Sequence, residues 1–518
     1  MKRKNIWILL SSLLLVSCQR HKISSPVSSS GSSQNSDSSQ TLSLSDHTSQ
    51  TTSKPSEVTV FAINDLHGSL EMGKNYGEPG LARLEYAIKH DSDYQASSSL
   101  IISSGDSWQG GYLSYEEKTL TDELLDMMGV KAMAIGNHEF DWGIETLEKL
   151  CTASPFPILG ANVKNLDGVR PSFLKASTTV DVGAVKYGII GAIGADLEDD
   201  IDVQSLGGYS FSSELNLLQD ETKKLKAEGC DVIFLSVHDD FGSDYVQSIS
   251  QAFSTSEIAG IFGGHSHRLQ NVYVNAIPYV QGGCNSYGYS KMTFQTKDQQ
   301  LVRKSYVDLR KGNYYFNLQD EQLNGNIVAR LKLANQKHHG DLPIATCEGN
   351  FERGYELRKL IPDAMVSVAD SYGWGNRHSG NELIAIHNTG GIRANLYSGP
   401  IGYKEIFKVS PFDNEVKVIE NIPGTKIASL LGNIKNSHSS DYYAFSTQSD
   451  AAFDSSKVYD VVTIDYVSMG NYWNKAIGHA EPQHDLDKDN NQPVYARDTI
   501  IKFMLSHPEP FKAKDYRY

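Results

Sequence analysis

The chain has 518 residues, of which 39% are hydrophobic and 21% charged, and its formal net charge is −15. That length is too great for one hydrophobic core and predicts two folded domains with additional segments. The composition excludes a wholly disordered chain, and the negative charge argues against a surface that coats nucleic acid.

The N-terminus has the pattern of an export signal. A basic segment, Lys2–Lys4, precedes an apolar run, Ile6–Val16, that is too short to span a bilayer. The run ends in Leu-Val-Ser-Cys, which resembles a bacterial lipobox, in which the Cys becomes the lipidated first residue of the mature protein. We therefore expect residues 1–17 to be a lipoprotein signal peptide and Cys18 to carry the lipid. An ordinary signal peptide with an incidental Cys18 is the alternative.

Residues 18–56 predict a flexible tether. They are rich in Ser and Thr and contain almost no large apolar side chains, so they cannot bury enough surface to fold. A tether after a lipidated Cys18 would hold a catalytic body off the outer face of a bacterial cell membrane, which is where we expect the protein to be anchored.

The remaining cysteines lie far apart and form no Cys-x-x-Cys pair; they are Cys151, Cys230, Cys284 and Cys347. We expect them to be buried free thiols. Export would permit disulfides, but their spacing assigns no pairing.

Apolar runs and helical patterns alternate over residues 57–317. The runs predict strands at Val58–Ile63, Leu100–Ile102, Ala132–Ile135, Tyr187–Ile190, Val232–Leu235 and Ile258–Phe262. Between them lie helical patterns such as Leu81–Ile88 and Leu120–Met128. This alternation predicts an α/β domain, and in such domains ligands gather beyond the ends of the strands.

A helix with one apolar face is predicted over Leu318–Lys337, and it would stop at His338-His339-Gly340. We take residues 318–341 as a connector and residues 342–518 as a second domain. The second domain has apolar runs that predict strands at Glu382–Ile386 and Val458–Ile464.

Five short fragments carry potential metal ligands, and each follows an apolar run. They are Asp65-Leu66-His67, Gly105-Asp106, Gly136-Asn137-His138-Glu139, His238-Asp239 and Gly264-His265-Ser266-His267. Their carboxylate, imidazole and amide groups, without thiolates, favour Mn, Zn, Fe or Co over a purely structural Zn site. A single Asp or His in a loop is commonly a solvated or capping residue. The ordered set of five instead predicts a binuclear centre that hydrolyses phosphate esters.

The five fragments resemble the motifs D-x-H, G-D, G-N-H-[ED], H and G-H-x-[HQ] of the calcineurin-like metallophosphoesterases. Within that group the chain resembles the 5′-nucleotidase family over nearly everything after residue 57. The resemblance implies an α/β (α+β) protein with an N-terminal β-sandwich flanked by helices, a connector helix, and a smaller C-terminal α/β nucleotide-binding domain.

The resemblance also implies two divalent metal ions, whose identity among Mn, Zn, Co and Fe stays open. One ion would be held by Asp65, His67, Asp106 and His267. The other would be held by Asp106, Asn137, His238 and His265. A water bridging the two ions would ionise near neutral pH and attack phosphorus in line with the leaving oxygen.

His138 resembles the family histidine that binds no metal and stabilises the transition state. Asp141 resembles the family aspartate that pairs with this histidine and orients it. Such a pair favours the imidazolium, which can donate a proton to the phosphate or the leaving group. The alternative for Asp141 is a carboxylate that only stabilises the start of a helix.

Two motifs of the second domain resemble the family's nucleotide-binding motifs. The segment Asn388–Arg393 matches N-x-G-G-x-R, and the segment Pro411–Asn414 matches P-F-x-N, in which the Phe stacks on the base. The resemblance implies substrate contacts from Asn388, Gly390, Gly391, Arg393, Phe412 and Asn414. Paired glycines let a backbone approach a ligand closely, and an Arg can bind phosphate with two N–H groups.

The rest of the substrate site departs from the family pattern. Tyr466 can stack opposite Phe412 and so close an aromatic clamp. The family's Asp of that segment is missing, and Tyr472 falls near its place, which leaves the base preference open. Arg353 aligns loosely with a further phosphate-contacting Arg of the family, and a solvated surface Arg is the alternative.

These patterns predict an extracellular, metal-dependent hydrolase of phosphoric ester bonds that removes phosphate from nucleoside 5′-monophosphates, with di- and triphosphates as further substrates. Hydrolysis of 2′,3′-cyclic nucleotides or UDP-sugars at the same metals is one alternative. A lipoprotein that binds nucleotides without turnover is another. We expect a nucleotide and a membrane as partners, and neither a nucleic-acid polymer nor an obligate protein partner. Because the metals would be bound in one domain and the base clamp lies in the other, we expect the two domains to close on the substrate. The connector would then act as the hinge.

Overall fold

The computed structural model describes residues 53–75, 77–376, 381–435, 443–447, 453–478, 483–487 and 493–516. The chain divides into a first unit, Met1–Thr51, and a second, Thr52–Tyr518. The predicted signal peptide, Cys18 and most of the predicted tether lie outside the described residues. Among the residues that are described, no helix combines the length and apolar character needed to cross a bilayer.

Two six-stranded sheets form the first domain. One has the order β14-β13-β1-β2-β3-β4, with β1 (Glu57–Ile63), β2 (Ser99–Ser103), β3 (Val130–Ala134), β4 (Ile158–Leu159), β13 (Gly288–Gln295) and β14 (Leu301–Asp308). The other has the order β11-β12-β10-β9-β7-β6, with β6 (Ser177–Val182), β7 (Val185–Ile193), β9 (Val232–His238), β10 (Ile261–Gly263), β11 (Leu269–Val274) and β12 (Ile277–Gly282). A small pair, β5 (Val163–Lys164) and β8 (Ser210–Phe211), lies outside them.

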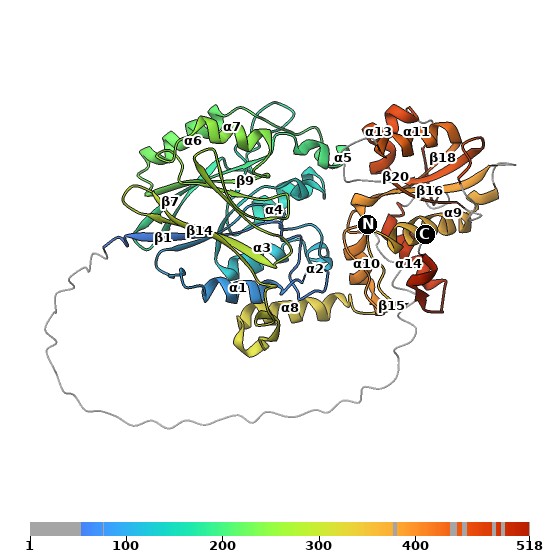
Figure 1. Cartoon of the computed structure of the whole chain (residues 1–518), viewed down its shortest axis with the longest axis horizontal. Helices are drawn as coiled ribbons and strands as arrows, with labels where there is room; N and C mark the ends of the chain where they lie inside the picture. Colours follow the sequence, from blue (N-terminus) through green and yellow to red (C-terminus); the bar gives the residue numbers. More distant parts are fainter. Residues whose placement is uncertain are drawn as a thin grey trace, which may run out of the picture. The chain divides into compact units, whose positions relative to one another are not determined.

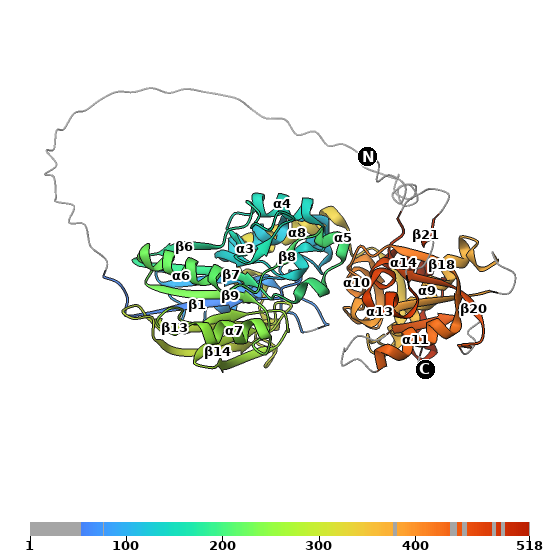
Figure 2. The same ribbon diagram turned by 90° about the horizontal axis from the view of Figure 1, so that it is seen from above.

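The helices of this domain cover the outer faces of the sheets. They are α1 (Leu81–Lys89), α2 (Tyr112–Glu116), α3 (Leu120–Met128), α4 (Ile144–Ala153), α5 (Val203–Leu206), α6 (Asn216–Ala227) and α7 (Asp244–Ala252). Figure 1 shows α6 and α7 on the side of β7 and β9, and α1 and α3 on the side of β1. Figure 2 shows β13 and β14 beside each other near β1, and both β1–β13 and β13–β14 pair antiparallel.

The alternation of buried side chains explains this layering. Val58 and Val60 of β1 pack in the same core as Tyr187 of β7, between the two sheets. Phe61 points the other way and packs with the core that contains α1 and α3. In β9, Leu235 packs with residues of α6 and α7. Strands buried on both faces read as continuous apolar runs, and the predicted sandwich flanked by helices is confirmed.

The second domain is built on a five-stranded sheet, order β19-β16-β20-β18-β21. Its strands are β16 (Glu382–Asn388), β18 (Val416–Pro423), β19 (Tyr443–Thr447), β20 (Val458–Ile464) and β21 (Gln483–Asp485). Its helices are α9 (Glu356–Ser371), α10 (Tyr403–Val409), α11 (Gly424–Lys435), α12 (Asp465–Met469), α13 (Asn471–Ala476) and α14 (Ala496–Leu505). In Figure 1, α11 and α13 lie on one side of β18 and β20, and α9 and α14 on the other. A three-stranded sheet, β17-β15-β22, adds β15 (Pro343–Glu348), β17 (Gly399–Gly402) and β22 (Phe511–Lys512).

The connector helix α8 spans Gly325–His338, so it begins later than the sequence pattern predicts. A short 3-10 turn occupies Asp320–Gln322, and the side chain of Asn324 caps the helix by accepting the N–H of Asn326. The helix ends as predicted, because His339 takes the left-handed conformation (φ 54°) that terminates helices.

The cysteines Cys151, Cys230, Cys284 and Cys347 are all free thiols in the structure. Three of them are buried, and Cys230 is half-buried. Burial raises the pKa of the Cys230 thiol to about 11, so it is protonated at neutral pH. The expectation of unpaired cysteines is therefore confirmed for these residues.

Candidate metal centre

The loops that carry the predicted ligands begin where parallel strands end. Asp65 follows β1, Asp106 follows β2, Asn137 follows β3 and His265 follows β10. His238 is the last residue of β9 rather than a residue of the loop beyond it. Because β1, β2 and β3 pair in parallel, their carboxyl ends meet at one edge of the sheet, where the loops converge.

Five of these residues have a left-handed backbone, with φ values of 50° at Asp65, 49° at His67, 53° at Asp106, 70° at His265 and 60° at His267. Residues with a β-carbon rarely adopt this conformation, and each instance costs about 1–3 kcal/mol. A fold tolerates such strain where the surrounding structure imposes it, and it commonly does so at a functional site.

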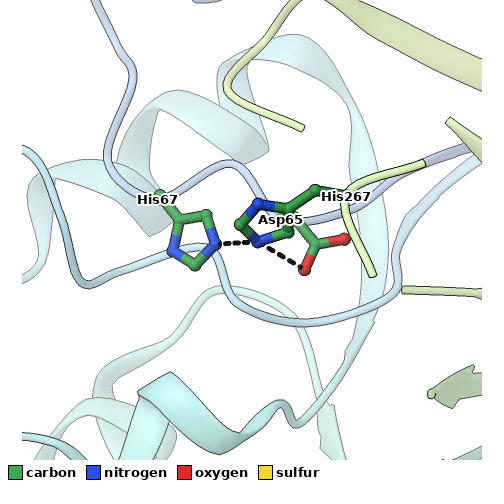
Figure 3. Close-up of side chains that lie close together, drawn as sticks. All are labelled: Asp65, His67 and His267. Carbon is green, nitrogen blue, oxygen red and sulfur yellow. Dashed lines mark hydrogen bonds and ion pairs between the residues drawn. The ribbon is translucent and has the colours of Figure 1, made fainter. Parts of the chain in front are cut away.

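His67, His267 and Asp65 form the first group of converging ligand atoms (Figure 3). The Nε2 atoms of the two histidines lie 2.9 Å apart, and Nε2 of His267 lies 3.7 Å from Oδ1 of Asp65. Burial lowers the pKa of both imidazoles, in the case of His267 to about 3. Two neutral imidazole nitrogens and a carboxylate facing one point form a suitable binding site for a cation.

Asp106, His238 and His265 form a second group. Oδ2 of Asp106 lies 3.1 Å from Nε2 of His238 and 4.0 Å from Nε2 of His67, so this carboxylate stands between the two groups. The same oxygen is buried and, apart from this approach of His238, has no hydrogen-bond partner among the described residues. The Oδ1 atom of Asn137 lies 3.1 Å from Nε2 of His238 and 3.2 Å from Nδ1 of His265.

These positions fit two divalent cations sharing Asp106. A buried carboxylate is costly unless a positive charge compensates it. Burial alone would lower the pKa of His238, but Asp106 outweighs this and raises it to about 10. A cation at this point would take the place of that proton.

A surrounding layer of hydrogen bonds orients the ligands, and sequence patterns did not single it out. Nδ1–H of His238 donates to the Ser104 carbonyl at 2.7 Å, which leaves Nε2 as the ligand atom. The amide of Asn64 donates to Oδ2 of Asp65 at 2.5 Å.

Glu139 holds the two loops that carry Asp106 and Asn137. Its buried carboxylate accepts the backbone N–H groups of Asp106, Ser107, Trp108 and Gly136 at 2.8–3.2 Å. Burial and the neighbouring Asp106 raise the pKa of Glu139 to about 7, and bound cations would oppose this rise. The only sequence signal for this role was its place after Asn137-His138.

His138 and Asp141 form the predicted pair. Nδ1 of His138 lies 2.7 Å from Oδ2 of Asp141, and the side chains are 11% exposed. Burial lowers the pKa of His138, but Asp141 and Asp106 outweigh this effect, and the pKa is raised. The backbone N–H of His138 donates to Oδ1 of Asp106 at 2.9 Å, so the pair adjoins the metal ligands.

A cleft of about 820 Å³ joins these residues to the second domain. Its lining includes the predicted substrate residues Asn388, Gly390, Gly391, Arg393, Phe412, Asn414 and Tyr466, together with His138 and Asp141. The ring of Phe412 lies 5.9 Å from that of His138, and the Arg393 guanidinium lies 5.8 Å from the Phe412 ring.

Arg353 is not among the described residues that line the cleft; its backbone N–H donates to the side chain of Asn395. Tyr472 does line it, as does an acidic stretch, Glu198–Asp202, that the sequence patterns did not indicate. From this stretch, Oδ2 of Asp200 lies 3.5 Å from Nε2 of His265.

A helix-flanked β-sandwich with this ligand arrangement defines a metal-dependent hydrolase of phosphoric esters. Two family models match the chain: the calcineurin-like phosphoesterase model over residues 58–269, and the 5′-nucleotidase C-terminal domain model over residues 337–474. The chain therefore belongs to the 5′-nucleotidase family, whose calcineurin-like domain uses a binuclear divalent metal centre.

Named relatives agree with the family models. A 5′-nucleotidase-related protein of Glossina morsitans morsitans is 26% identical over 426 residues, covering 72% of this chain and 74% of the relative. A 5′-nucleotidase of Vibrio cholerae is 24% identical over 418 residues, covering 71% and 74%. The structure of a 5′-nucleotidase precursor from Thermus thermophilus superposes with a TM-score of 0.66 at 19% identity, covering 87% of this chain and 96% of that one. The last comparison shows that the fold is shared.

Proposed function

We propose that the protein releases phosphate from nucleoside 5′-monophosphates outside the cell. The observation that carries this proposal is a cleft whose lining includes both the predicted metal ligands Asp106, Asn137 and His265 and the predicted nucleotide residues Arg393 and Phe412. The names of the 5′-nucleotidase relatives from Vibrio cholerae and Bos taurus support the same substrate class.

We assign the following roles in catalysis and substrate binding to residues of the chain. Two divalent cations, when bound by the seven predicted ligands, neutralise phosphoryl charge and make a water more acidic. Arg393 would bind the phosphate through its planar guanidinium. Phe412 and Tyr466 would hold the base between aromatic faces. The presence of Arg393, Phe412 and Tyr466 in the lining of one cleft supports these assignments.

His138 would donate a proton during bond cleavage. Its Nδ1 atom is bound to Asp141, so Nε2 is the atom left to act toward the cleft, which His138 lines. The carboxylate of Asp141 keeps the imidazolium form populated and holds the ring in place. A proton given to the leaving ribose oxygen would complete the cleavage of the phosphorus–oxygen bond.

A phosphate-release screen tests the proposal. The purified protein is offered AMP, ADP, ATP, 2′,3′-cyclic AMP and UDP-glucose, with added Mn or Zn and with a chelator. We expect the fastest release from AMP and its loss with chelator or in Asn137→Ala. Asn271→Ala, exposed on β11, serves as the matched control and should behave like the wild type.

Other outcomes of the screen have definite meanings. Release from AMP that survives both the chelator and Asn137→Ala would contradict the metal mechanism. Faster release from cyclic nucleotides or UDP-glucose than from AMP would select those activities instead. No release from any substrate with Mn present, but binding of AMP, would favour a nucleotide-binding lipoprotein without turnover.

The proposed location rests on the sequence of the N-terminal segment. Its basic residues, short apolar run and Cys18 support export and lipid anchoring to the outer face of a bacterial membrane. Expression in bacteria with a radiolabelled fatty acid should label the protein, and Cys18→Ala should abolish the label. Equal labelling of Cys18→Ala would contradict the anchor.

A further inference from the structure

The loop Pro411–Asn414, which carries Phe412 and Asn414, is held from the start of helix α14. This helix lies beyond residue 474, where the match to the family model ends. The backbone N–H of Ala496 donates to the carbonyl of Asn414 at 3.0 Å. The neighbouring Arg497 is 2% exposed and reaches the same loop with its side chain.

The guanidinium of Arg497 binds the backbone and the side chain of the loop together. Its Nη1 atom donates to the Phe412 carbonyl at 2.7 Å, and its Nη2 atom pairs with the Asp413 carboxylate. Nη2 also donates to the hydroxyl of Tyr115 at 3.2 Å, and that hydroxyl donates to Asp413 at 2.9 Å. The Phe412 carbonyl, the Asp413 carboxylate and the Tyr115 hydroxyl therefore all bind the buried guanidinium of Arg497.

Aromatic rings hold the guanidinium in this position. Its central carbon lies 5.0 Å from the ring centre of Tyr115, 5.2 Å from that of Phe407 and 4.8 Å from that of Tyr495. A planar guanidinium suits such a pocket, because it can stack on rings while its N–H groups donate in the plane. An ammonium group has no plane to stack and donates in other directions.

These contacts hold the loop that carries the Phe412 ring in one position. A backbone carbonyl bonded at 2.7 Å limits the rotation of the peptide that follows Phe412, and the Asn414 carbonyl is bound as well. The two bonds lie on either side of Asp413, whose carboxylate is also paired. The loop is therefore set before a nucleotide arrives, and a preorganised ring stacks on a base without further loss of loop entropy.

We propose that Arg497 is a positioning residue for nucleobase recognition, acting through the Phe412 loop; this inference rests on the proposed function. It assigns no part of the phosphate chemistry to Arg497. The contacts of Arg497 reach Phe412, Asp413, Tyr115 and the aromatic rings around it, whereas Asp106, Asn137 and His138 belong to other loops.

The test compares a substrate that has a base with one that has none. AMP and ribose 5-phosphate share the phosphate ester and the leaving oxygen, but only AMP has an aromatic base that can stack on Phe412. We expect Arg497→Met to raise KM for AMP by about tenfold, within the range reported for loss of one base–aromatic stack. For ribose 5-phosphate, kcat and KM should stay within about twofold of the wild type.

Three further variants keep the test decisive. Arg497→Lys retains the charge and should give an intermediate KM for AMP, which covers the case in which Arg497→Met does not fold. Arg83→Met is the matched control, because Arg83 likewise donates to two backbone carbonyls, those of Tyr315 and Leu318, both at 3.0 Å. Arg83→Met should leave the ratio of KM for AMP to KM for ribose 5-phosphate unchanged. In a Phe412→Ala background, Arg497→Met should add no further rise in KM for AMP.

Each contrary result points to one error. If Arg497→Met and Arg497→Lys leave KM for AMP unchanged, or slow both substrates equally, Arg497 has only a structural role and the inference is wrong. If the wild type hydrolyses ribose 5-phosphate but not AMP, the proposed function fails instead. Additive effects of Phe412→Ala and Arg497→Met on KM for AMP would also overturn the inference.

Discussion

At the scale of single residues, the site depends on side chains that touch no substrate. Glu139 gathers the backbone N–H groups of Asp106, Ser107, Trp108 and Gly136 around one carboxylate. Asp106 has a left-handed backbone at φ 53°, which is unfavourable in isolation. The hydrogen bonds to Glu139 therefore offset the strain of the loop that presents the shared ligand.

Replacing Glu139 with Gln should weaken metal binding. The Gln side chain keeps one acceptor oxygen but turns an NH₂ group toward backbone N–H donors, so some of the four hydrogen bonds to residue 139 are lost. We expect the affinity for Mn²⁺ to fall about 10–100-fold, as for other groups that orient metal ligands. Calorimetric titration of the chelator-treated protein measures this. Glu85→Gln, at a buried carboxylate on α1, is the control and should bind Mn²⁺ like the wild type.

Replacing Asp141 with Asn should change the pH profile. Asp141 is a main cause of the raised pKa of His138, so without its charge the imidazolium is lost at lower pH. A reaction that needs the protonated His138 is fastest below that pKa and slows as the pH rises through it. We expect kcat/KM at neutral pH to fall about 10²-fold or more, and its alkaline limb to move to lower pH. An alkaline limb that stays in place would contradict the role of the pair.

At the scale of elements, the connector helix α8 is part of the first domain's core rather than a bare link. Its residues Ile327 and Ala334 are buried in the cluster that also contains residues of α1 and α3. Arg330, Lys337 and His338 of α8 all reach the carboxylate of Glu117, which follows α2. This network ties the helix to the loop between α2 and α3, and the hinge role of the connector stays a prediction.

The Glu117 network should make stability depend on acid pH. Burial would raise the pKa of Glu117, but Lys337, Arg330 and His338 outweigh it and lower the pKa to about 2. A lowered pKa stabilises the fold fully above the ordinary value of 4.5 and loses this effect as the pH falls through about 2. At pH 7, Glu117→Gln should lower Tm by about 2–4 °C, the shift that about 1 kcal/mol produces.

Thermal unfolding from pH 7 down to pH 2 measures this difference. The gap in Tm between Glu117→Gln and the wild type should close toward the acid end. Glu145→Gln is the control, because the Glu145–Lys149 pair is exposed on α4 and contributes little. A gap that stays constant over the whole range would show that the charge of Glu117 is not the cause.

At the scale of the whole molecule, binding of the cations should stabilise the first domain. The ligands come from loops after β1, β2, β3 and β10 and from the end of β9, so both sheets contribute to one site. In the unfolded chain these residues are far apart and form no preformed site, so binding free energy adds to folding. The strain of the left-handed loops is released only when the fold opens.

Adding Mn²⁺ to the chelator-treated protein should therefore raise Tm. At an ion concentration of about 100 times Kd, the gain of about 2.7 kcal/mol corresponds to about 5–10 °C. Asp106→Asn, which removes the shared carboxylate charge, should lose most of the rise. A rise of the same size in Asp106→Asn would place the ions at some other site.

The sequence alone predicted the central strands of the first domain and the candidate ligands of the site. Strands buried on both faces are continuous apolar runs, which is why β1, β2, β7 and β9 were predictable. Ligand chemistry depends on residue type, so ordered motifs were enough to indicate Asp65, Asp106 and the histidines. The first turn of the connector was not predictable, because the cap at Asn324 and the 3-10 turn before it compete locally with the helical pattern.

Only the tertiary structure decided which groups support those residues. Glu139 accepts the backbone N–H of Asp106, and the backbone carbonyl of Ser104 accepts from the His238 ring. Arg497 acts on a carbonyl of a loop that lies 85 residues away in sequence. A backbone donor or acceptor is present at nearly every position, so no residue pattern marks the ones that are used. Their partners are chosen by packing, which brings distant segments together only in the folded chain.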